Sequence, residues 1–398
     1  MNSSPKRIFY LITDLDIGGA EKMLFELVQR IDRNKFTPEV GCLKGRGIVG
    51  KKLEALGIKV RYFRIEKTWD IYKLFGIFFF LRQGHFDILH SYLFHANIIG
   101  RVCGRMAGIP IIISSIRVCE MGEPRHLRID KSTLKWADGM RWKDTITRLA
   151  DMMRWKDMIT WLNKIIDRMV DIEICVSKEV KNFTIEKAGI PEHRLEVVEN
   201  GIPDSFLDAV TSYRNKKAHS LVVGTVARLS RQKGIEYLLH AAKTVIKQFP
   251  DITFIIAGKG PLESQLKGLS IKLGISDKVK FLGFNDDIPK LLSVIDIFVL
   301  PSLWEGMPNV VLEAMAAGKP VIATDTGGSK DIIDSGINGV LVEPKNSEAL
   351  AEAILALLGD PAQRKRLGES ARDKVKERFP IDKMVSKTEQ IYTQLLNQ

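Results

Sequence analysis

The chain has 398 residues, of which 45% are hydrophobic and 27% charged, so it is long enough for two domains and has the composition of a soluble globular protein. Its net charge of +12 favours anionic partners such as nucleotide phosphates or acidic lipid headgroups, with nucleic acid the weaker alternative. The longest apolar run, Leu74–Leu81, is far shorter than the ~18 residues of a membrane span, and the apolar run Ile8–Ile12 is too short for a signal peptide.

The cysteines are scattered along the chain without C-x-x-C spacing, and no cluster of Cys and His has the spacing of metal ligands. We therefore expect reduced thiols and a cytoplasmic location. The cysteines are Cys42, Cys103, Cys119 and Cys175.

Short apolar runs alternate with helical stretches, which predicts parallel α/β layers in two doubly wound halves. In the first half the expected strands are Ile8–Ile12, Glu39–Leu43, Lys59–Ile65, Asp87–Ser91, Pro110–Ser115, Ile172–Val176 and Leu195–Val198. In the second half they are Leu221–Ala227, Ile252–Ala257, Val279–Leu282, Ile297–Leu300, Val321–Ala323 and Gly339–Val342. The Gly-, Pro- and Ser-containing stretch Asn200–His219 predicts a connection between the halves, and a last helix is expected over Ile381–Leu396.

A possible anion site follows the first predicted strand, in the run Asp14-Leu-Asp16-Ile-Gly18-Gly19-Ala-Glu. Paired glycines let a backbone approach a ligand closely, and the next helix N-terminus can receive an anion. A tight strand-to-helix turn explains the glycines equally well. Because Asp14 and Asp16 form a D-x-D pair, divalent metal binding is an alternative at this position.

Two histidines, His90 and His95, flank the end of the fourth predicted strand, and His95 begins the run His95-Ala-Asn97. A single histidine is most often a hydrogen-bonded structural residue. The residues alone therefore assign neither histidine a chemical role.

The segment 125–168 departs from the alternating pattern. Met-Arg-Trp-Lys-Asp occurs at Met140 and again at Met153, which indicates a short tandem duplication. Cations outnumber carboxylates in this segment and are interleaved with Trp and Met, a mixture that suits a membrane interface or an acidic lipid-phosphate acceptor. The alternatives are a helical hairpin without a special role and binding of nucleic acid.

Two cations, Arg228 and Lys233, follow the first strand of the second half. Arg supplies a forked donor and Lys a point charge, so two such residues at a strand end suit a diphosphate. As an isolated pattern they would more often be a surface pair, and Arg231 between them is expected to be solvated.

The stretch Pro301–Gly328 predicts a loop, a helix and a strand, and it carries the carboxylates Glu305 and Glu313. Eight residues of helix rise would separate them by roughly 12 Å, too far to act together on one glycosidic bond but suited to the two ends of an elongated, hydroxyl-rich ligand. Backbone amides at the helix N-terminus favour a phosphate between them; they belong to Met307, Asn309 and Val310. This combination predicts a nucleotide-sugar site, whereas the alternative makes Glu305 a helix cap and Glu313 a solvated residue.

Glu305-Gly-Met-Pro-Asn-Val-Val-Leu-Glu313 resembles the E-x7-E motif of the retaining GT-B glycosyltransferases of glycosyltransferase family four. Gly18-Gly19-Ala-Glu, Arg228-x4-Lys233-Gly and Ala-Gly258-x-Gly-Pro-Leu262 are similar to further motifs of that family. The resemblance covers nearly the whole chain. It implies an α/β protein with the GT-B fold, two doubly wound Rossmann-like domains facing each other across a cleft.

The resemblance also implies roles for individual residues. Gly18 and Gly19 contact phosphate, while Glu313 binds the ribose hydroxyls. His95, in an H-x-A-N-like segment, faces the transferred sugar, and Glu305 binds that sugar. The implied catalytic residues are His95, Glu305, Arg228 and Lys233; the further substrate-binding positions are Gly258, Leu262, Phe284, Gly306, Met307, Pro308, Asn309 and Val310.

The implied activity is a retaining, metal-independent transfer of a sugar from a nucleoside-diphosphate sugar to an acceptor hydroxyl, in the synthesis of a surface polysaccharide such as lipopolysaccharide or of a lipid-linked glycan. The nucleotide-sugar is a co-substrate, and no metal or other cofactor is expected. The other expected partners are a glycan or lipid-linked acceptor and, through 125–168, the cytoplasmic face of the membrane; nucleic acid is not expected.

The implied domains are an acceptor-side domain over 1–204, a donor-binding domain over 205–378 and a terminal helix over 379–398 that crosses back to the first domain. One alternative is a non-catalytic sugar-nucleotide-binding or scaffolding subunit of a polysaccharide assembly complex. Another, suggested only by the charge, is a glycosyltransferase that modifies nucleic acid.

Overall fold

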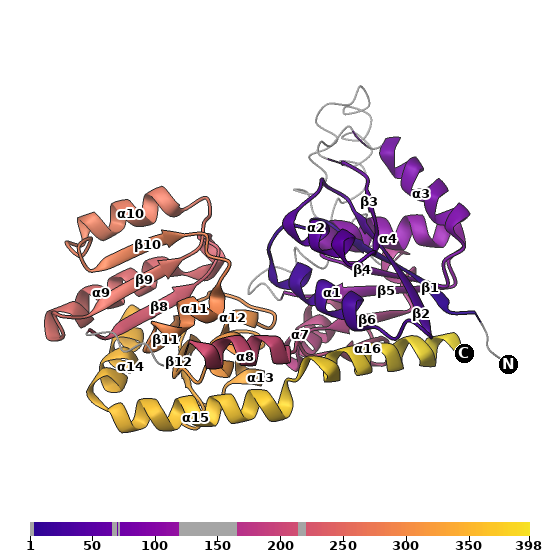
Figure 1. The fold of residues 1–398 in the computed structure, drawn as a ribbon. Helices are drawn as coiled ribbons and strands as arrows, with labels where there is room; N and C mark the ends of the chain where they lie inside the picture. The colour runs from indigo at the N-terminus through magenta and orange to yellow at the C-terminus, as the bar shows by residue number, and fades with distance from the viewer. Residues whose placement is uncertain (1–3, 66–69, 71, 119–164, 214–219) are drawn as a thin grey trace. The chain divides into compact units, whose positions relative to one another are not determined.

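The computed structural model describes residues 4–65, 70, 72–118, 165–213 and 220–398 (Figure 1). Cys119 and most of the basic segment 125–168 lie outside the described residues. The chain divides into two compact units: the first comprises Met1–Val198 and Val385–Gln398, the second Glu199–Met384.

The first unit contains, among its described residues, a seven-stranded sheet in the order β3-β2-β1-β4-β5-β6-β7, in which every pairing is parallel. The central strands β4 and β5 are buried along their whole length, as expected for a parallel sheet covered by helices on both faces. The strands are β1 (Lys6–Ile12), β2 (Phe36–Cys42), β3 (Lys59–Tyr62), β4 (Ile88–Tyr92), β5 (Ile111–Ile116), β6 (Ile172–Cys175) and β7 (Leu195–Val197).

The helices of the first unit come from both ends of the chain. Apolar residues of α3 and α4 pack on Phe9, Leu89 and Ile112 of the sheet to form the core. The described helical segments are α1 (Gly19–Arg30), α2 (Ile48–Ala55), α3 (Tyr72–Gly84), α4 (Phe94–Ala107), α7 (Lys178–Phe183), η2 (Thr184–Ala188), η3 (Glu192–Arg194) and, from Val385 onward, α16 (Ile381–Leu396).

The C-terminal helix α16 contributes the fully buried Tyr392 to the first unit. Its hydroxyl lies 2.6 Å from Nδ1 of His90 and 3.3 Å from the hydroxyl of Tyr10. The predicted helix over Ile381–Leu396 is confirmed, and it completes a core whose strands lie near the other end of the chain.

The second unit repeats the same topology, with a described six-stranded parallel sheet in the order β10-β9-β8-β11-β12-β13. Its strands are β8 (Val222–Val226), β9 (Thr253–Ala257), β10 (Val279–Gly283), β11 (Ile297–Leu300), β12 (Val321–Thr324) and β13 (Val340–Val342). Its described helices are α8 (Asp204–Ser212), η4 (Arg231–Lys233), α9 (Ile235–Gln248), α10 (Glu263–Lys272), α11 (Ile288–Ser293), α12 (Asn309–Ala316), α13 (Ser329–Ile332), α14 (Ser347–Gly359) and α15 (Pro361–Arg378). Every strand predicted from the sequence is present, within three residues at either end.

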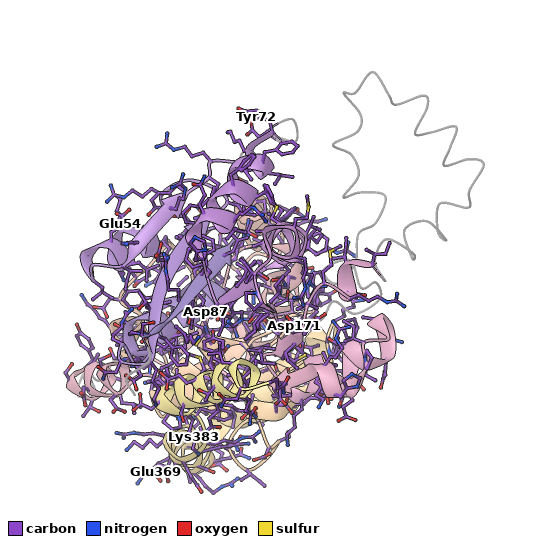
Figure 2. The ribbon with its side chains drawn as sticks, turned by 90° about the vertical axis from the view of Figure 1, so that its right-hand side faces the viewer. Glu54, Tyr72, Asp87, Asp171, Glu369 and Lys383 are labelled. Carbon is purple, nitrogen blue, oxygen red and sulfur yellow. The ribbon has the colours of Figure 1, made fainter. Side chains whose placement is uncertain are left out.

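The same type of hydrogen bond, from a backbone N–H to an aspartate carboxylate, joins neighbouring strands in both sheets. Asp87 and Asp171, labelled in Figure 2, each precede a strand and accept a hydrogen bond from the backbone N–H of the neighbouring strand, at 2.8 Å from Arg7 and 2.7 Å from Ile112. Asp296 does the same for Val222 at 2.8 Å. These N–H groups belong to the first or second residue of β1, β5 and β8, where the carboxylates satisfy backbone donors at the start of each strand.

The stretch Asn200–His219, predicted as a connection, contains helix α8, which packs on α11 and α12 within the second unit. The hydroxyl of Tyr213, at the end of α8, donates to Asp287 at 3.2 Å. The described part of this stretch is therefore folded on the second unit, because the apolar face of α8 buries Phe206 and Val210.

Candidate donor site in the second unit

The strand order of the second sheet reverses between β8 and β11, and in open parallel sheets ligands bind outside the carboxyl ends of the strands at such a switch point. The loops that follow these two strands are bonded to each other. Leu303 N donates to the Gln232 carbonyl at 2.7 Å, and the Gln232 side chain donates to the Trp304 carbonyl at 3.0 Å. The ammonium of Lys233 forms an ion pair with Glu305.

Gly234 makes the close approach of these loops possible. Its backbone is left-handed, with φ of 56°, and a Cβ at this position would lie 2.2 Å from the carbonyl oxygen of Pro301. Any other residue would separate the Lys233 loop from the Glu305 loop.

Glu305 is a buried loop residue, 5% exposed, and lies three residues before Pro308, the N-cap residue of α12. Its Oε1 accepts a hydrogen bond from Ser302 Oγ at 2.6 Å and faces Lys233. Helix α12 begins only at Asn309, after Pro308 at the N-cap position, so the separation calculated from helix rise does not apply to this pair of carboxylates. Glu313, on α12, is 3% exposed, and the alternative of a solvated surface residue is therefore wrong.

Arg228 is exposed and lies two residues after the end of β8. The loop after β9 packs beside it: Leu229 N donates to the Lys259 carbonyl and Leu262 N to the Leu229 carbonyl, both at 3.0 Å. Gly258 is required there, since a Cβ would lie 1.9 Å from the Ala227 carbonyl oxygen.

The loop after β10 joins the same edge of the sheet. Gly258 N donates to the Gly283 carbonyl at 2.7 Å, and the next residue, Phe284, is 45% exposed. Four adjacent strands of this sheet thus end in loops that carry the predicted site residues, with cations beside β8 and an aromatic ring beside β10.

The start of α12 is held by Asn200, a residue that the sequence reading did not place in the site. Its side-chain amide donates to the Met307 carbonyl at 3.2 Å and to Asn309 Oδ1 at 2.6 Å. Gly306 accepts a hydrogen bond from Gly328 N at 2.7 Å on the other side of the loop. The local run Glu199-Asn-Gly201-Ile says nothing about partners that lie 107 and 109 residues away.

In the first unit, Gly18 is the N-cap of α1 and Gly19 its first residue. The backbone of Gly18 is extended, with φ of −156°, so any residue could adopt it. A Cβ at Gly18 would instead lie 2.2 Å from the carboxylate of Glu21, which folds back over the turn and whose pKa is raised by burial.

The carboxylate of Asp14 closes a turn with Asp16 instead of pairing with the Asp16 carboxylate. Its Oδ1 accepts the N–H of Asp16 at 3.1 Å, and its Oδ2 lies 3.0 Å from the ammonium of Lys44. Within the described residues no group of three or more His, Cys, Asp and Glu could hold a metal ion.

The two histidines differ in environment. His90 is buried, with Nδ1 on Tyr392 and Nε2 2.9 Å from Ser115 Oγ, and burial, together with the nearby positive charge of Arg117, lowers its pKa well below 6.5. His95 is exposed in the first turn of α4. Of these two histidines, His95 is accessible from the surface and His90 is not.

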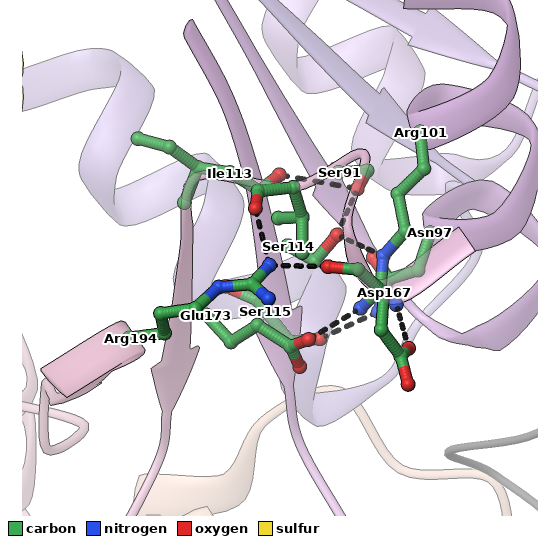
Figure 3. A network of polar contacts seen from close by, with 10 residues as sticks. Ser91, Asn97, Arg101, Ile113, Ser114, Ser115, Asp167, Glu173 and Arg194 are labelled. Carbon is green, nitrogen blue, oxygen red and sulfur yellow. Dashed lines mark hydrogen bonds and ion pairs between the residues drawn. The ribbon is translucent and has the colours of Figure 1, made fainter. Parts of the chain in front are cut away.

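A cavity of about 80 Å³ lies beside the start of α4 in the first unit. Arg101, from α4, forms its inner wall, held by Ser114 at 3.0 Å and by Asp167 and Glu173 at 3.1 Å each (Figure 3). Burial raises the pKa of Glu173, and Arg101 opposes that rise. The lining residues are Leu93, Phe94, Asn97, Ile98, Arg101, Ser115, Ile116, Arg117 and Val118.

Two doubly wound units, with cations and buried carboxylates at a strand switch point, are typical of α/β proteins that bind phosphorylated ligands. Residues 17–206 match Glycosyltransferase Family 4, and residues 212–374 match Glycosyl transferases group 1. The chain belongs to the group 1 glycosyltransferases and is a nucleotide-sugar-dependent enzyme of the GT-B fold.

Similar proteins span nearly the whole chain. The UDP-Gal:alpha-D-GlcNAc-diphosphoundecaprenol alpha-1,3-galactosyltransferase of Escherichia coli is 27% identical, over 96% of this chain and 95% of that protein. The putative glycosyltransferase EpsF of Bacillus subtilis strain 168 is 26% identical, over 91% and 90%. The crystal structure of Anabaena Alr3699/HepE in complex with UDP and glucose has a similar fold, with a TM-score of 0.78 and 23% identity over 98% of this chain and 100% of that one.

The part of the chain that the structure describes contains no helix both long enough and apolar enough to cross a membrane.

Proposed function

We propose that the enzyme transfers a sugar from a nucleoside-diphosphate donor to an acceptor hydroxyl with retention of configuration and without a metal ion. The observation that carries this proposal is the joined pair of loops at the β8/β11 switch point. They bring Lys233 and Glu305 into contact, and the exposed Arg228 belongs to the same stretch after β8 as Lys233.

The donor diphosphate binds Arg228 and Lys233 in this proposal, and both cations stabilise the charge that grows on the departing diphosphate. Lys233 then exchanges its carboxylate partner for a phosphate. The exchange leaves Glu305 to accept hydrogen bonds from hydroxyls of the transferred sugar, so the two residues of one ion pair bind the diphosphate and the sugar of the donor.

The remaining donor contacts come from the loops already described. Glu313 binds the ribose, and the nucleotide lies near Gly258, Leu262 and Phe284. The α12 N-terminus, where the helix dipole is positive, faces the donor phosphates or sugar; its residues are Gly306, Met307, Pro308, Asn309 and Val310. Within the first unit, the proposed ligand contacts are the backbone amides of Gly18 and Gly19 and the side chain of His95.

The acceptor is proposed to be a lipid-linked or polysaccharide glycan. The Escherichia coli relative supports this by its name, which specifies a GlcNAc-diphosphoundecaprenol acceptor and a UDP-linked galactose. The HepE structure, which contains UDP and glucose, makes a UDP-sugar the first donor to test here.

A thermal-shift screen over UDP-, GDP- and ADP-sugars tests donor binding, because a ligand at about 100 times its Kd stabilises the native state by about 2.7 kcal/mol. Release of nucleoside diphosphate from the stabilising donor then tests catalysis. A donor that stabilises the protein but is never turned over with any acceptor would favour the alternative of a non-catalytic sugar-nucleotide-binding subunit.

A further inference from the structure

Helix α3 (Tyr72–Gly84) exposes an aromatic stripe on the face opposite its buried side. Ile77 and Leu81 are buried in the core of the first unit. Tyr72, Phe75 and Phe79 are 64%, 66% and 55% exposed, and Tyr72 projects outward at the top of Figure 2. A surface helix of a globular protein ordinarily has polar residues on this face.

The exposed side chains form one continuous stripe. Positions i, i+3 and i+7 lie within about 60° of each other around a helix of 3.6 residues per turn. Phe79 also packs edge-on against Phe78, with ring centroids 5.1 Å apart, so the stripe is anchored to the half-buried flank of the helix. Large exposed apolar patches of this kind mark protein or membrane contacts.

Cations outnumber carboxylates in the sequence around the stripe. The range 59–84 contains six Lys and Arg against Glu66 and Asp70, and the segments 59–65 and 72–84 contain no Asp or Glu. Arg82 is exposed one turn beyond Phe79, whereas Lys73 is paired with Asp70 at 3.2 Å. The charged residues of the two segments are Lys59, Arg61, Arg64, Lys73 and Arg82.

We propose that this face of α3 docks on an anionic lipid bilayer, with the three aromatic rings in the headgroup region and Arg82 on lipid phosphates. Aromatic rings flanked by Lys and Arg are the composition that binds at a bilayer interface. The inference rests on the proposed function in one respect: a lipid-linked acceptor holds its reacting sugar at the membrane surface. It uses residues separate from the 125–168 segment.

Charge argues against a second copy of the chain as the occupant. A symmetric contact through this face would bring the same cations of two subunits together, and like charges repel. An anionic lipid surface has the complementary sign.

The test is co-sedimentation of the full chain with vesicles of phosphatidylcholine mixed with phosphatidylglycerol, compared with pure phosphatidylcholine. We expect stronger binding to the mixed vesicles. Phe75→Ser combined with Phe79→Ser should weaken it about 100-fold, because each ring withdrawn from the interface costs about tenfold. Arg82→Gln should weaken binding to the mixed vesicles about fivefold and leave binding to phosphatidylcholine unchanged.

Ile271→Ser is the matched control, since Ile271 is 68% exposed on α10 of the second unit and should not affect binding. Vesicle binding that is unchanged in the double variant, or equal on both lipids, contradicts the proposal. The proposal is also contradicted if light scattering shows that the parent protein is a dimer and the double variant is a monomer. If the double variant does not fold, Phe75→Ser alone and Arg82→Gln decide. Nucleoside diphosphate release measured without vesicles should be equal in all variants, so failure of the donor site remains distinguishable.

Discussion

Arg228 offers the most direct test of the donor site. Its exposed side chain lies directly after β8, so Arg228→Ala should leave unfolding stability within about 0.5 kcal/mol of the parent. Loss of a charge that acts in the transition state should lower kcat/KM about 100- to 1000-fold. Steady-state kinetics with Arg231→Ala, another exposed cation, provide the control; near-normal turnover by Arg228→Ala would remove the diphosphate assignment.

The Lys233–Glu305 pair is predicted to contribute both to the stability of the protein and to its activity. A double variant separates these two contributions. Lys233→Met leaves a buried carboxylate with Ser302 but without its ammonium, and should destabilise the protein by about 3 kcal/mol. Adding Glu305→Leu removes the orphaned charge and should restore most of the stability but none of the activity. Chemical denaturation and turnover assays on both variants measure the two contributions; recovery of activity in the double variant would contradict the proposed roles.

His90 predicts a pH dependence of stability in the first unit. Its folded pKa lies below the unfolded value of about 6.5 because it is buried. Below pH 6.5 the unfolded chain takes up a proton that the folded chain does not. The free energy of unfolding therefore decreases as the pH is lowered, by at most about 1.4 kcal/mol per pH unit. The stability advantage of the wild type over His90→Gln should therefore shrink between about pH 7 and pH 5.5.

Denaturation of both proteins across that range measures the effect, and a constant difference would contradict it. Glu21 and Glu173, whose pKa values are raised by burial, act in the opposite direction but are present in both proteins and cancel. Tyr92, which stacks beside His90 and whose pKa is raised to about 12, does not titrate in this range.

Single residues were predictable where a motif fixes them and not where a partner is distant. Spacing and resemblance alone place Arg228 and Glu305 on the loops after β8 and β11 and Glu313 on α12, and their roles stay predictions. The contact between Lys233 and Glu305 joins residues 72 positions apart and depends on how two loops fold against each other. Asn200 was missed for the same reason.

Among the structural elements, the loop before α12 is predicted to depend on Asn200. Asn200→Ala removes donors to Met307 and Asn309, so the donor KM should rise about tenfold while kcat changes little. Asn346→Ala is the control: it removes the cap of α14 at Ala349 and should cost about 1 kcal/mol of stability without affecting the donor KM. Equal KM values for the two variants would show that Asn200 does not position the loop.

Strands were predictable because parallel strands covered on both faces are short, nearly continuous apolar runs, as in β4 and β11. Helix α8 was missed because it follows Gly201 and Pro203, which indicate a connection when read alone. Its apolar residues Phe206 and Val210 are buried, and this packing outweighs the local signal.

At the scale of the whole molecule, we predict that transfer does not depend on a metal ion. This prediction distinguishes a turn residue at Asp14 from a metal ligand in a D-x-D pair. Because the described structure engages its carboxylate with Asp16 and Lys44, we expect EDTA to leave transfer unchanged. Initial rates with EDTA and after addition of Mg²⁺ or Mn²⁺ measure this. Strict dependence on either ion would revive the D-x-D interpretation.

The fold class followed from the alternation of strands and helices, but the sharing of α16 between units did not follow from any local pattern. Tyr392 belongs to the core of a unit whose sheet is made by residues before Val198. During translation at about 5–20 residues per second, the nascent first half leaves the ribosome on the order of ten to forty seconds before Tyr392 is made. Throughout that interval His90 and Tyr10 lack their last partner, so the N-terminal half can reach its final packing only after Tyr392 has been synthesised.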